Sequence, residues 1–226
     1  MVLDPEKVHI SEPLQLPAVY PILDTATMRA EGFSAVDFAA ALLEGGARVL
    51  QFRHKAFWSR EVVAEASGVA RLCREAGVAF VVNDRADYAA YLDAGVHLGQ
   101  EDLLPRDARA VIGKRPIGFS THNAAQVRAA QSEPVDYVAF GPVFPTGSKD
   151  RPDPVTGIAA LREARALTAK PLVAIGGITP ENAALCWEAG ADSVAVISGL
   201  IPHSRALLTK MALRTRMEEW LKLAIT

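Results

Sequence analysis

Three long polar side chains occupy alternate positions of one short segment: Gln51, Arg53 and Lys55. The residues between them suit a strand, and residues two apart on a strand share a face. One amide and two cations on one face can bind an anion such as a phosphate or a diphosphate. Two cations inside a closed barrel would be costly without that anion, so the alternative is an edge strand whose polar face meets water.

The elements that must position this face are predicted by glycines that end helical patterns, each followed by an apolar strand. Strands are expected over residues 18–23, 49–52, 79–83, 96–98, 117–120, 137–140, 172–175 and 194–197. Helices are expected over 34–44, 59–75, 86–92, 106–112, 123–131, 157–167, 180–188 and 204–223. This alternation predicts an α/β protein, a single (β/α)8 TIM barrel. A doubly wound sheet is the alternative, but its usual Gly-x-Gly-x-x-Gly turn does not follow the first strand.

The composition limits the kinds of partner. The 226 residues include 24 Lys and Arg against 26 Asp and Glu, a net charge of −2, which gives no basic field for nucleic acid or an anionic membrane. No apolar run approaches the ~20 residues of a membrane span, and residues 1–15 are a polar extension without the apolar core of a signal peptide. We expect one cytoplasmic domain over 1–226, with helix 204–223 packed on the barrel. Whether it forms a homo-oligomer stays open.

Carboxylates follow the next two strands of the predicted barrel. Asp84 comes directly after residues 79–83, and Asp102 comes shortly after 96–98. Because the strand ends of a barrel converge, both are expected beside Arg53 and Lys55. They could neutralise the cations in a structural network. The surplus of cations favours a second role, binding of Mg²⁺, which prefers one or two carboxylates together with substrate phosphate oxygens.

Two further stretches at strand ends suit a phosphate group. Thr179-Pro-Glu181 predicts a helix start whose N–H groups, beside Ser198-Gly199 and the preceding Gly176-Gly177, could bind a phosphate. A plain tight turn is the alternative. The loop over 141–154 is long and rich in hydroxyl groups, so we expect a lid over a bound substrate rather than a flexible surface loop.

The histidines contribute little to this chemistry. His122 follows a predicted strand and could act as an acid or a base. His9, His54, His97 and His203 are expected to be structural, and no histidine pair has the spacing of zinc ligands.

Seven segments together resemble the motif set of thiamine-phosphate synthase, from about residue 20 to residue 200. They are, in order, Gln51-Phe-Arg-His-Lys55, Val82-Asn-Asp-Arg85, Gly95-Val-His-Leu-Gly-Gln-Glu-Asp102, Gly118-Phe-Ser-Thr-His122, Gly141-Pro-Val-Phe-Pro-Thr-Gly-Ser-Lys149, Ile175-Gly-Gly-Ile178 and Val196-Ile-Ser198. The resemblance implies a transferase that joins 4-amino-2-methyl-5-hydroxymethylpyrimidine diphosphate to a thiazole phosphate. It also implies small molecules as partners and Mg²⁺ as cofactor.

Carried over position by position, the resemblance implies a role for each site residue. The pyrimidine diphosphate would contact Gln51, Arg53, Lys55, Asn83, Ser120 and Lys149. The thiazole phosphate would contact Thr146, Ser148, Gly177, Ile197 and Ser198. Mg²⁺ would bind Asp84 and Asp102. The cations Arg53, Lys55 and Lys149 would be catalytic, because they would stabilise the departing pyrophosphate.

Two other functions stay open at this point. Thiazole tautomerases share the barrel and the thiazole phosphate pocket, and His122 falls where their catalytic histidine is expected, but they generally lack the full Gln-x-Arg-x-Lys and Asn-Asp pairs. A non-catalytic protein that binds thiazole phosphate or thiamine phosphate is the third possibility. The cluster of cations and carboxylates favours the synthase, because a pure binder would gain little from desolvating so many charges.

Overall fold

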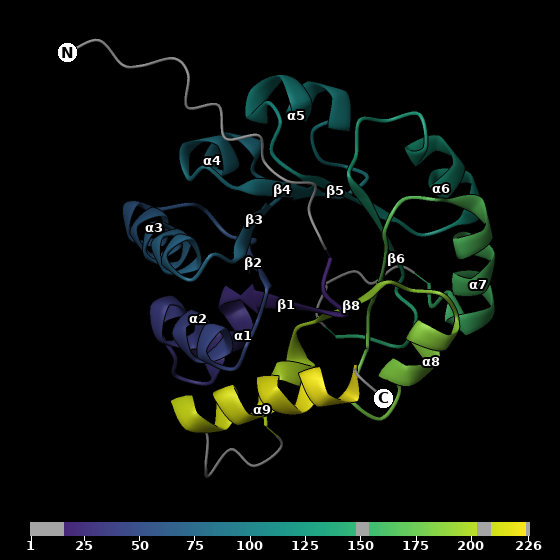
Figure 1. Ribbon diagram of the computed structural model, residues 1–226. Coiled ribbons are helices and arrows are strands. Elements are labelled where there is room, and N and C mark those ends of the chain that lie inside the picture. The colour runs from purple at the N-terminus through teal and green to yellow at the C-terminus, as the bar shows by residue number, and fades with distance from the viewer. Residues whose placement is uncertain (1–15, 148–153, 203–208, 225–226) are drawn as a thin grey trace.

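The computed structural model describes residues 16–147, 154–202 and 209–224. Eight parallel strands close into a barrel in chain order, with the helices in a ring around them (Figure 1). The strands are β1 (Val19–Asp24), β2 (Val49–Arg53), β3 (Ala79–Asn83), β4 (Gly95–Leu98), β5 (Ile117–Thr121), β6 (Tyr137–Phe140), β7 (Leu172–Ile175) and β8 (Ser193–Val196). The predicted (β/α)8 barrel is confirmed, and each strand lies within one residue of its expected ends.

The helices that follow the strands agree less closely with expectation. They are α1 (Thr25–Ala30), α2 (Ala35–Glu44), α3 (Arg60–Glu75), α4 (Ala86–Tyr91), α5 (Pro105–Ile112), α6 (Ala124–Ala130), α7 (Gly157–Leu167), α8 (Ala183–Glu188) and α9 (Lys210–Leu223), with a 3₁₀ turn η1 (Ser198–Leu200) after β8. The sequence reasoning missed α1 and η1, which are too short to show a helical period. The first part of the expected helix 204–223 lies outside the described residues.

The expected helix start at Thr179 is wrong. The Thr179 N–H donates to Oδ1 of Asn182 at 2.8 Å, and the Thr179 carbonyl accepts from the N–H groups of Asn182 and Ala183. These bonds form a turn, so α8 begins only at Ala183. A phosphate site at this end of the barrel would therefore depend on the loop backbone, and not on a helix that begins at Thr179.

Alternation along the strands separates an inner apolar cluster from an outer one. Tyr20, Ile22, Val49 and Tyr137 are buried inside the barrel, whereas Leu50 belongs to the larger cluster between strands and helices. On β2, Val49 and Gln51 therefore face inward. The inner cluster fills the interior of the barrel below the strand ends with apolar side chains. The inward-facing polar residues therefore lie at the carboxyl ends of the strands.

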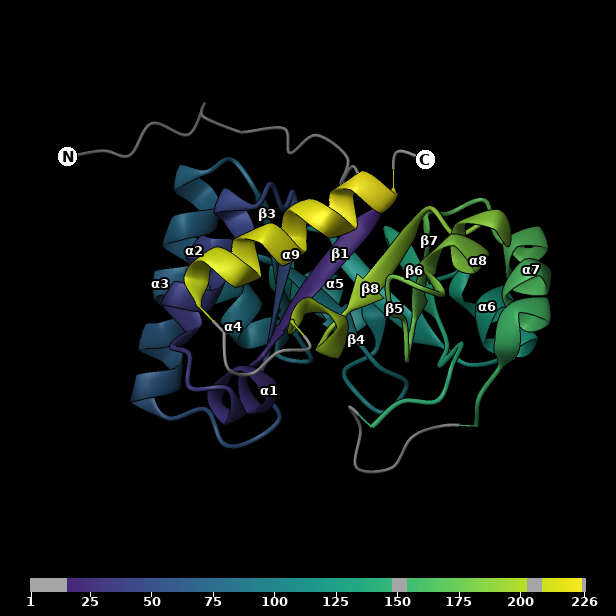
Figure 2. The same cartoon turned by 90° about the horizontal axis from the view of Figure 1, so that it is seen from below.

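The helix α9 lies across the side of the barrel beside α2 (Figure 2). Its buried stripe is Leu213, Met217 and Trp220, whereas Met211 is exposed. The indole N–H of Trp220 donates to the Gly199 carbonyl at 3.0 Å. The described part of the C-terminal helix thus packs on the barrel, and it supports the turn that follows β8. Among the described residues, no helix combines the length and the apolar character that crossing a membrane requires.

Candidate active site

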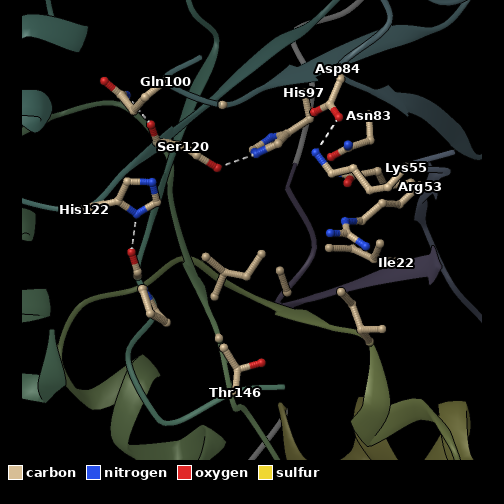
Figure 3. A pocket seen from close by; sticks show the side chains of 18 of the residues that line it. Ile22, Arg53, Lys55, Asn83, Asp84, His97, Gln100, Ser120, His122 and Thr146 are labelled. Carbon is tan, nitrogen blue, oxygen red and sulfur yellow. Dashed lines mark hydrogen bonds and ion pairs between the residues drawn. The ribbon is translucent and has the colours of Figure 1, made fainter. Parts of the chain in front are cut away.

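A cavity of about 960 Å³ opens where the strands end. Every predicted site residue in the described part of the chain lines it: Gln51, Arg53, Lys55, Asn83, Asp84, Asp102, Ser120, Thr146, Gly177, Ile197 and Ser198. Figure 3 shows Arg53 and Lys55 on one side of this space and Thr146 on another. Ser148 and Lys149 lie outside the described residues. The face predicted from alternation on β2 is therefore confirmed, because Gln51, Arg53 and Lys55 all reach the same space.

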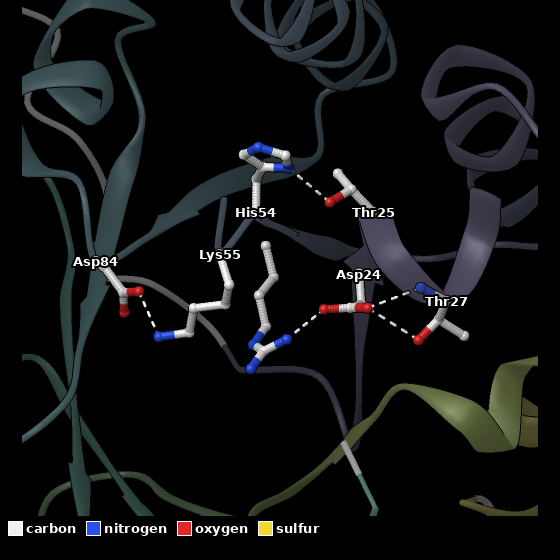
Figure 4. A network of polar contacts seen from close by, with 7 residues as sticks. Asp24, Thr25, Thr27, His54, Lys55 and Asp84 are labelled. Carbon is white, nitrogen blue, oxygen red and sulfur yellow. Dashed lines mark hydrogen bonds and ion pairs between the residues drawn. The ribbon is translucent and has the colours of Figure 1, made fainter. Parts of the chain in front are cut away.

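Arg53 is anchored by a carboxylate that the sequence reasoning missed. Asp24 ends β1 directly beside Arg53 in the strand register, and the two side chains form an ion pair (Figure 4). Asp24 is only 6% exposed and also accepts hydrogen bonds from the N–H and the hydroxyl of Thr27, both at 2.9 Å. The same carboxylate thus caps α1 and fixes the guanidinium at the cavity wall. The sequence pattern that could have indicated this cap is an acid, Asp24, at the end of an apolar strand, followed three residues later by Thr27.

Lys55 also has a carboxylate partner. Its ammonium lies 2.5 Å from the Asp84 carboxylate (Figure 4), and its side chain is 53% exposed. Without a ligand, Arg53 and Lys55 are therefore partly neutralised by Asp24 and Asp84. This agrees with the alternative that carboxylates and cations form a structural network. An ion pair this open to water contributes little stability, so substrate phosphate or a metal ion could replace it at small cost.

The two carboxylates Asp84 and Asp102 lie close together at the edge of the cavity. Burial raises the pKa of Asp84 to about 6, with Lys55 opposing this shift and the nearby Asp102 carboxylate adding to it. Asp84 also has a φ of 66°, which a non-glycine residue adopts at a cost. Among the described residues, no group of three or more His, Cys, Asp or Glu side chains could hold a metal. A pair of mutually repelling carboxylates fits Mg²⁺ that takes its other ligands from substrate and water.

Asn83 is poised to bind a ligand. Its side chain lines the cavity but is only 6% exposed, and its Nδ2 has no hydrogen-bond partner within the described part of the chain. A buried amide donor left unpaired costs free energy, so natural proteins rarely leave one without a purpose. A substrate acceptor in the cavity would satisfy it.

The opposite wall is formed by backbone. Gly176 and Gly177 have φ of 97° and 64°, and a Cβ at Gly177 would lie 2.3 Å from the Pro145 carbonyl oxygen. Only glycine allows the loop after β6, which carries Thr146, to approach the loop after β7 this closely. The Asn182 side chain holds the second loop by donating to the Gly177 carbonyl at 3.0 Å.

His97 has a larger part in the site than the sequence reasoning gave it. It lines the cavity and bonds to Ser120 Oγ at 2.9 Å and to the Tyr137 hydroxyl at 3.0 Å. The signal was its place between Val96 and Leu98, which both point outward, so the histidine must point inward. His122 also lines the cavity, and its Nδ1–H donates to the Gly141 carbonyl at 2.5 Å.

The fold and this site define a (β/α)8 barrel with a cavity of charged and polar side chains where its strands end. Residues 19–200 match the family described as thiamine monophosphate synthase. The chain belongs to that family. It is 46% identical over 199 residues to the thiamine-phosphate synthase of Koribacter versatilis, covering 85% of this chain and 94% of the relative.

Other known proteins agree with this assignment. The chain is 40% identical over 208 residues to the thiamine-phosphate synthase of Bacillus velezensis, covering 89% of this chain and 90% of that relative. A solved structure, thiamine phosphate pyrophosphorylase from Pyrococcus furiosus, superimposes with a TM-score of 0.77 at 31% identity, covering 92% of this chain and 95% of that one. Membership of the family makes this chain an enzyme.

Proposed function

We propose that the chain joins 4-amino-2-methyl-5-hydroxymethylpyrimidine diphosphate to 4-methyl-5-(2-phosphoethyl)thiazole, or to its carboxylated form, and releases thiamine phosphate and pyrophosphate. One observation carries the proposal: Arg53, Lys55, Asp84 and Asp102 line one side of a cavity whose other side contains the glycine loop at Gly177. The charged side suits a diphosphate, and the loop suits a single phosphate. A cavity of about 960 Å³ has room for two small molecules.

With the uncarboxylated thiazole phosphate, the proposed reaction breaks one bond and forms one. With the carboxylated form, the bond between the thiazole ring and its carboxylate also breaks and CO₂ leaves. The C–O bond between the pyrimidine methylene and the diphosphate breaks, and its electron pair leaves with the pyrophosphate oxygen. The thiazole nitrogen then donates its lone pair to the methylene carbocation, which the pyrimidine stabilises. Negative charge grows on the leaving group, where Arg53 and Lys55 would stabilise it together with Lys149, which lies outside the described residues.

The remaining residues would bind and orient the two substrates. Gln51, Asn83 and Ser120 would hold the pyrimidine diphosphate, and Thr146, Ser148, Gly177, Ile197 and Ser198 would hold the thiazole phosphate. Asp84 and Asp102 would hold Mg²⁺, which would supply positive charge to the diphosphate. No side-chain nucleophile is needed, because the two substrates react with each other.

The experiment that tests the proposal is product formation from the two substrates, with Mg²⁺ and with excess chelator. Thiamine phosphate and pyrophosphate are expected in equal amounts, and only with the metal. Absence of product under both conditions would contradict the proposal, and binding of thiazole phosphate without product would then favour a non-catalytic binder.

A second function, thiazole tautomerisation, is favoured by the position of His122 in the same cavity. The carbonyl of Gly141 accepts from Nδ1–H, so in the neutral ring Nε2 is the nitrogen that would take up a proton. If the chain is a synthase, His122→Ala keeps most of the coupling activity, because no step of the coupling needs this base. Loss of tautomerisation in His122→Ala, with no coupling activity in either protein, would favour the tautomerase.

A further inference from the structure

A chain of hydrogen-bonded side chains runs beneath the cavity floor and joins Gln51 to Ser120. Gln51 Nε2 lies 3.2 Å from the Tyr20 hydroxyl, which lies 2.8 Å from the Tyr137 hydroxyl. The Tyr137 hydroxyl lies 3.0 Å from His97 Nδ1, and His97 Nε2 lies 2.9 Å from Ser120 Oγ. Its members come from β2, β1, β6, β4 and β5 in turn. Both ends line the substrate cavity, and Figure 3 shows the bond between His97 and Ser120.

One direction of this chain gives an acceptor to the hydroxyl hydrogens of both tyrosines. An amide nitrogen only donates, so Tyr20 accepts from Gln51. If Tyr137 also donated to Tyr20, the buried Tyr20 hydrogen would have no acceptor among these side chains, so we take Tyr20 as the donor to Tyr137. In the same direction Tyr137 donates to Nδ1 of His97, which places the imidazole hydrogen on Nε2. His97 therefore donates to Ser120 Oγ. Ser120, having accepted this bond, keeps its hydroxyl hydrogen for the cavity.

The packing around the two tyrosines keeps the chain in this arrangement. Tyr20 and Tyr137 are each 1% exposed, and burial raises the pKa of Tyr20 to about 12 and that of Tyr137 well above its usual value. Both hydroxyls consequently keep their hydrogens at neutral pH. Gly118 makes the contact between rings possible, because a Cβ there would lie 2.1 Å from Tyr137 Cζ and 2.5 Å from His97 Nδ1.

We propose that His97 is a positioning residue for the coupling reaction, and that Tyr137 sets its tautomer so that Ser120 presents a hydrogen-bond donor to the pyrimidine diphosphate. The inference rests on the proposed function and adds a specificity element to it. The cavity then offers a fixed donor at Ser120, on the strand opposite the cationic face. Substrates with an acceptor at that point are favoured over analogues that carry a donor there, because a donor leaves the Ser120 hydrogen without an acceptor.

Tyr137→Phe tests this relay, since it removes one hydroxyl and keeps the ring. Without the Tyr137 hydrogen, His97 can move its proton to Nδ1 and accept from Ser120, which turns the serine hydrogen away from the substrate. We expect kcat/KM for the pyrimidine diphosphate to fall about 10-fold, the usual effect of one misdirected hydrogen bond. The matched control is Tyr88→Phe, whose ring stacks on Trp58 outside the cavity, and its kcat/KM is expected to stay at the wild-type value.

A double-variant cycle separates positioning from a general structural effect. If Tyr137 acts only through Ser120, then Ser120→Ala with Tyr137→Phe has the same kcat/KM as Ser120→Ala alone. Independent losses that multiply would overturn the relay. So would an unchanged kcat/KM in Tyr137→Phe.

The tautomer itself can be measured on the wild-type protein, without any variant of the relay. Nitrogen-15 NMR of the full chain, with the His97 signal assigned by comparison with His97→Gln, is expected to show the hydrogen on Nε2. A hydrogen on Nδ1 would overturn the inference whether or not Tyr137→Phe folds. This result is separate from the proposed function, which fails only if the wild-type protein forms no thiamine phosphate.

Discussion

Asp84→Asn is expected to abolish Mg²⁺-dependent coupling and, at the same time, to raise the thermal stability of the metal-free protein above pH 6. The loss of activity follows from the proposed metal site, because an amide carries no charge and is a poor ligand for Mg²⁺. We expect coupling to fall at least ~100-fold, the scale on which removal of one element of charge stabilisation slows an enzyme.

The gain in stability follows from the pKa of Asp84. Burial raises that pKa from 3.8 to about 6, so between these values the folded protein holds a proton that the unfolded chain has released. Stability therefore falls as pH rises through this window, and above pH 6 the folded state carries the full cost of the ionised carboxylate. Asparagine avoids this cost and also tolerates the φ of 66° better than most residues. The exposed partner Lys55 loses little.

The measurement is the melting temperature of both proteins from pH 4 to pH 8 in chelator. The difference between Asp84→Asn and wild type is expected to be positive above pH 6 and to shrink toward pH 4, where the wild-type carboxyl is protonated in the folded state and partly protonated in the unfolded chain. Added Mg²⁺ and pyrophosphate should then stabilise the wild type only. The control is Asp87→Asn, an exposed acid in α4 outside the cavity, with near wild-type coupling. Near-normal coupling in Asp84→Asn would contradict the metal assignment.

The positions of the site residues could be predicted from sequence where they depend on one strand. Alternation on β2 placed Gln51, Arg53 and Lys55 on one face, and the glycine-ended helices before the strands gave the barrel and hence the end where those residues meet. Both inferences use local periodicity, which the sequence displays directly. The same rule applied to His97 would have placed it in the cavity, because its neighbours Val96 and Leu98 are apolar.

Contacts between strands could not be predicted in this way. The pairs Asp24–Arg53 and Tyr20–Tyr137 depend on the register of neighbouring strands and on which inward residues meet across the barrel. Neither quantity is visible in a single strand, since both follow from the stagger with which the sheet closes. The helix start at Thr179 failed for a related reason. Its sequence suits an N-cap, but residues 180–182 form a turn and the helix begins only at Ala183.

Arg53→Met is expected to lower both the coupling rate and the stability of the fold, by two separable routes. The rate falls because the cation that would face the departing pyrophosphate is lost, and removal of one such group costs about 10²–10³-fold in kcat. Stability falls because Asp24, only 6% exposed, keeps its charge and loses its ion-pair partner. Removing one member of a buried pair costs about 3–5 kcal/mol, and we expect the lower end because Thr27 still donates to Asp24.

The double variant Asp24→Asn with Arg53→Met separates the two routes. Asparagine can still cap α1 through its amide oxygen, and it leaves no buried charge without a partner. Stability is therefore expected to return most of the way to the wild-type value, while coupling stays as low as in Arg53→Met. The control Arg29→Met makes the same change in an exposed ion pair with Glu65, and it should alter neither quantity much.

Chemical denaturation and coupling kinetics on these variants decide between the roles of Arg53. Recovery of coupling together with stability in the double variant would mean that Arg53 serves the fold alone, and the leaving pyrophosphate would have to depend on Lys55 and Lys149. Recovery of stability without coupling would place Arg53 among the catalytic residues and give Asp24 the role of holding it. In that case the stability lost in Arg53→Met, about 3–5 kcal/mol for a buried ion pair, would be the free energy with which Asp24 holds Arg53 at the cavity wall. The register of β1 and β2 sets this contact, because it places the two residues side by side.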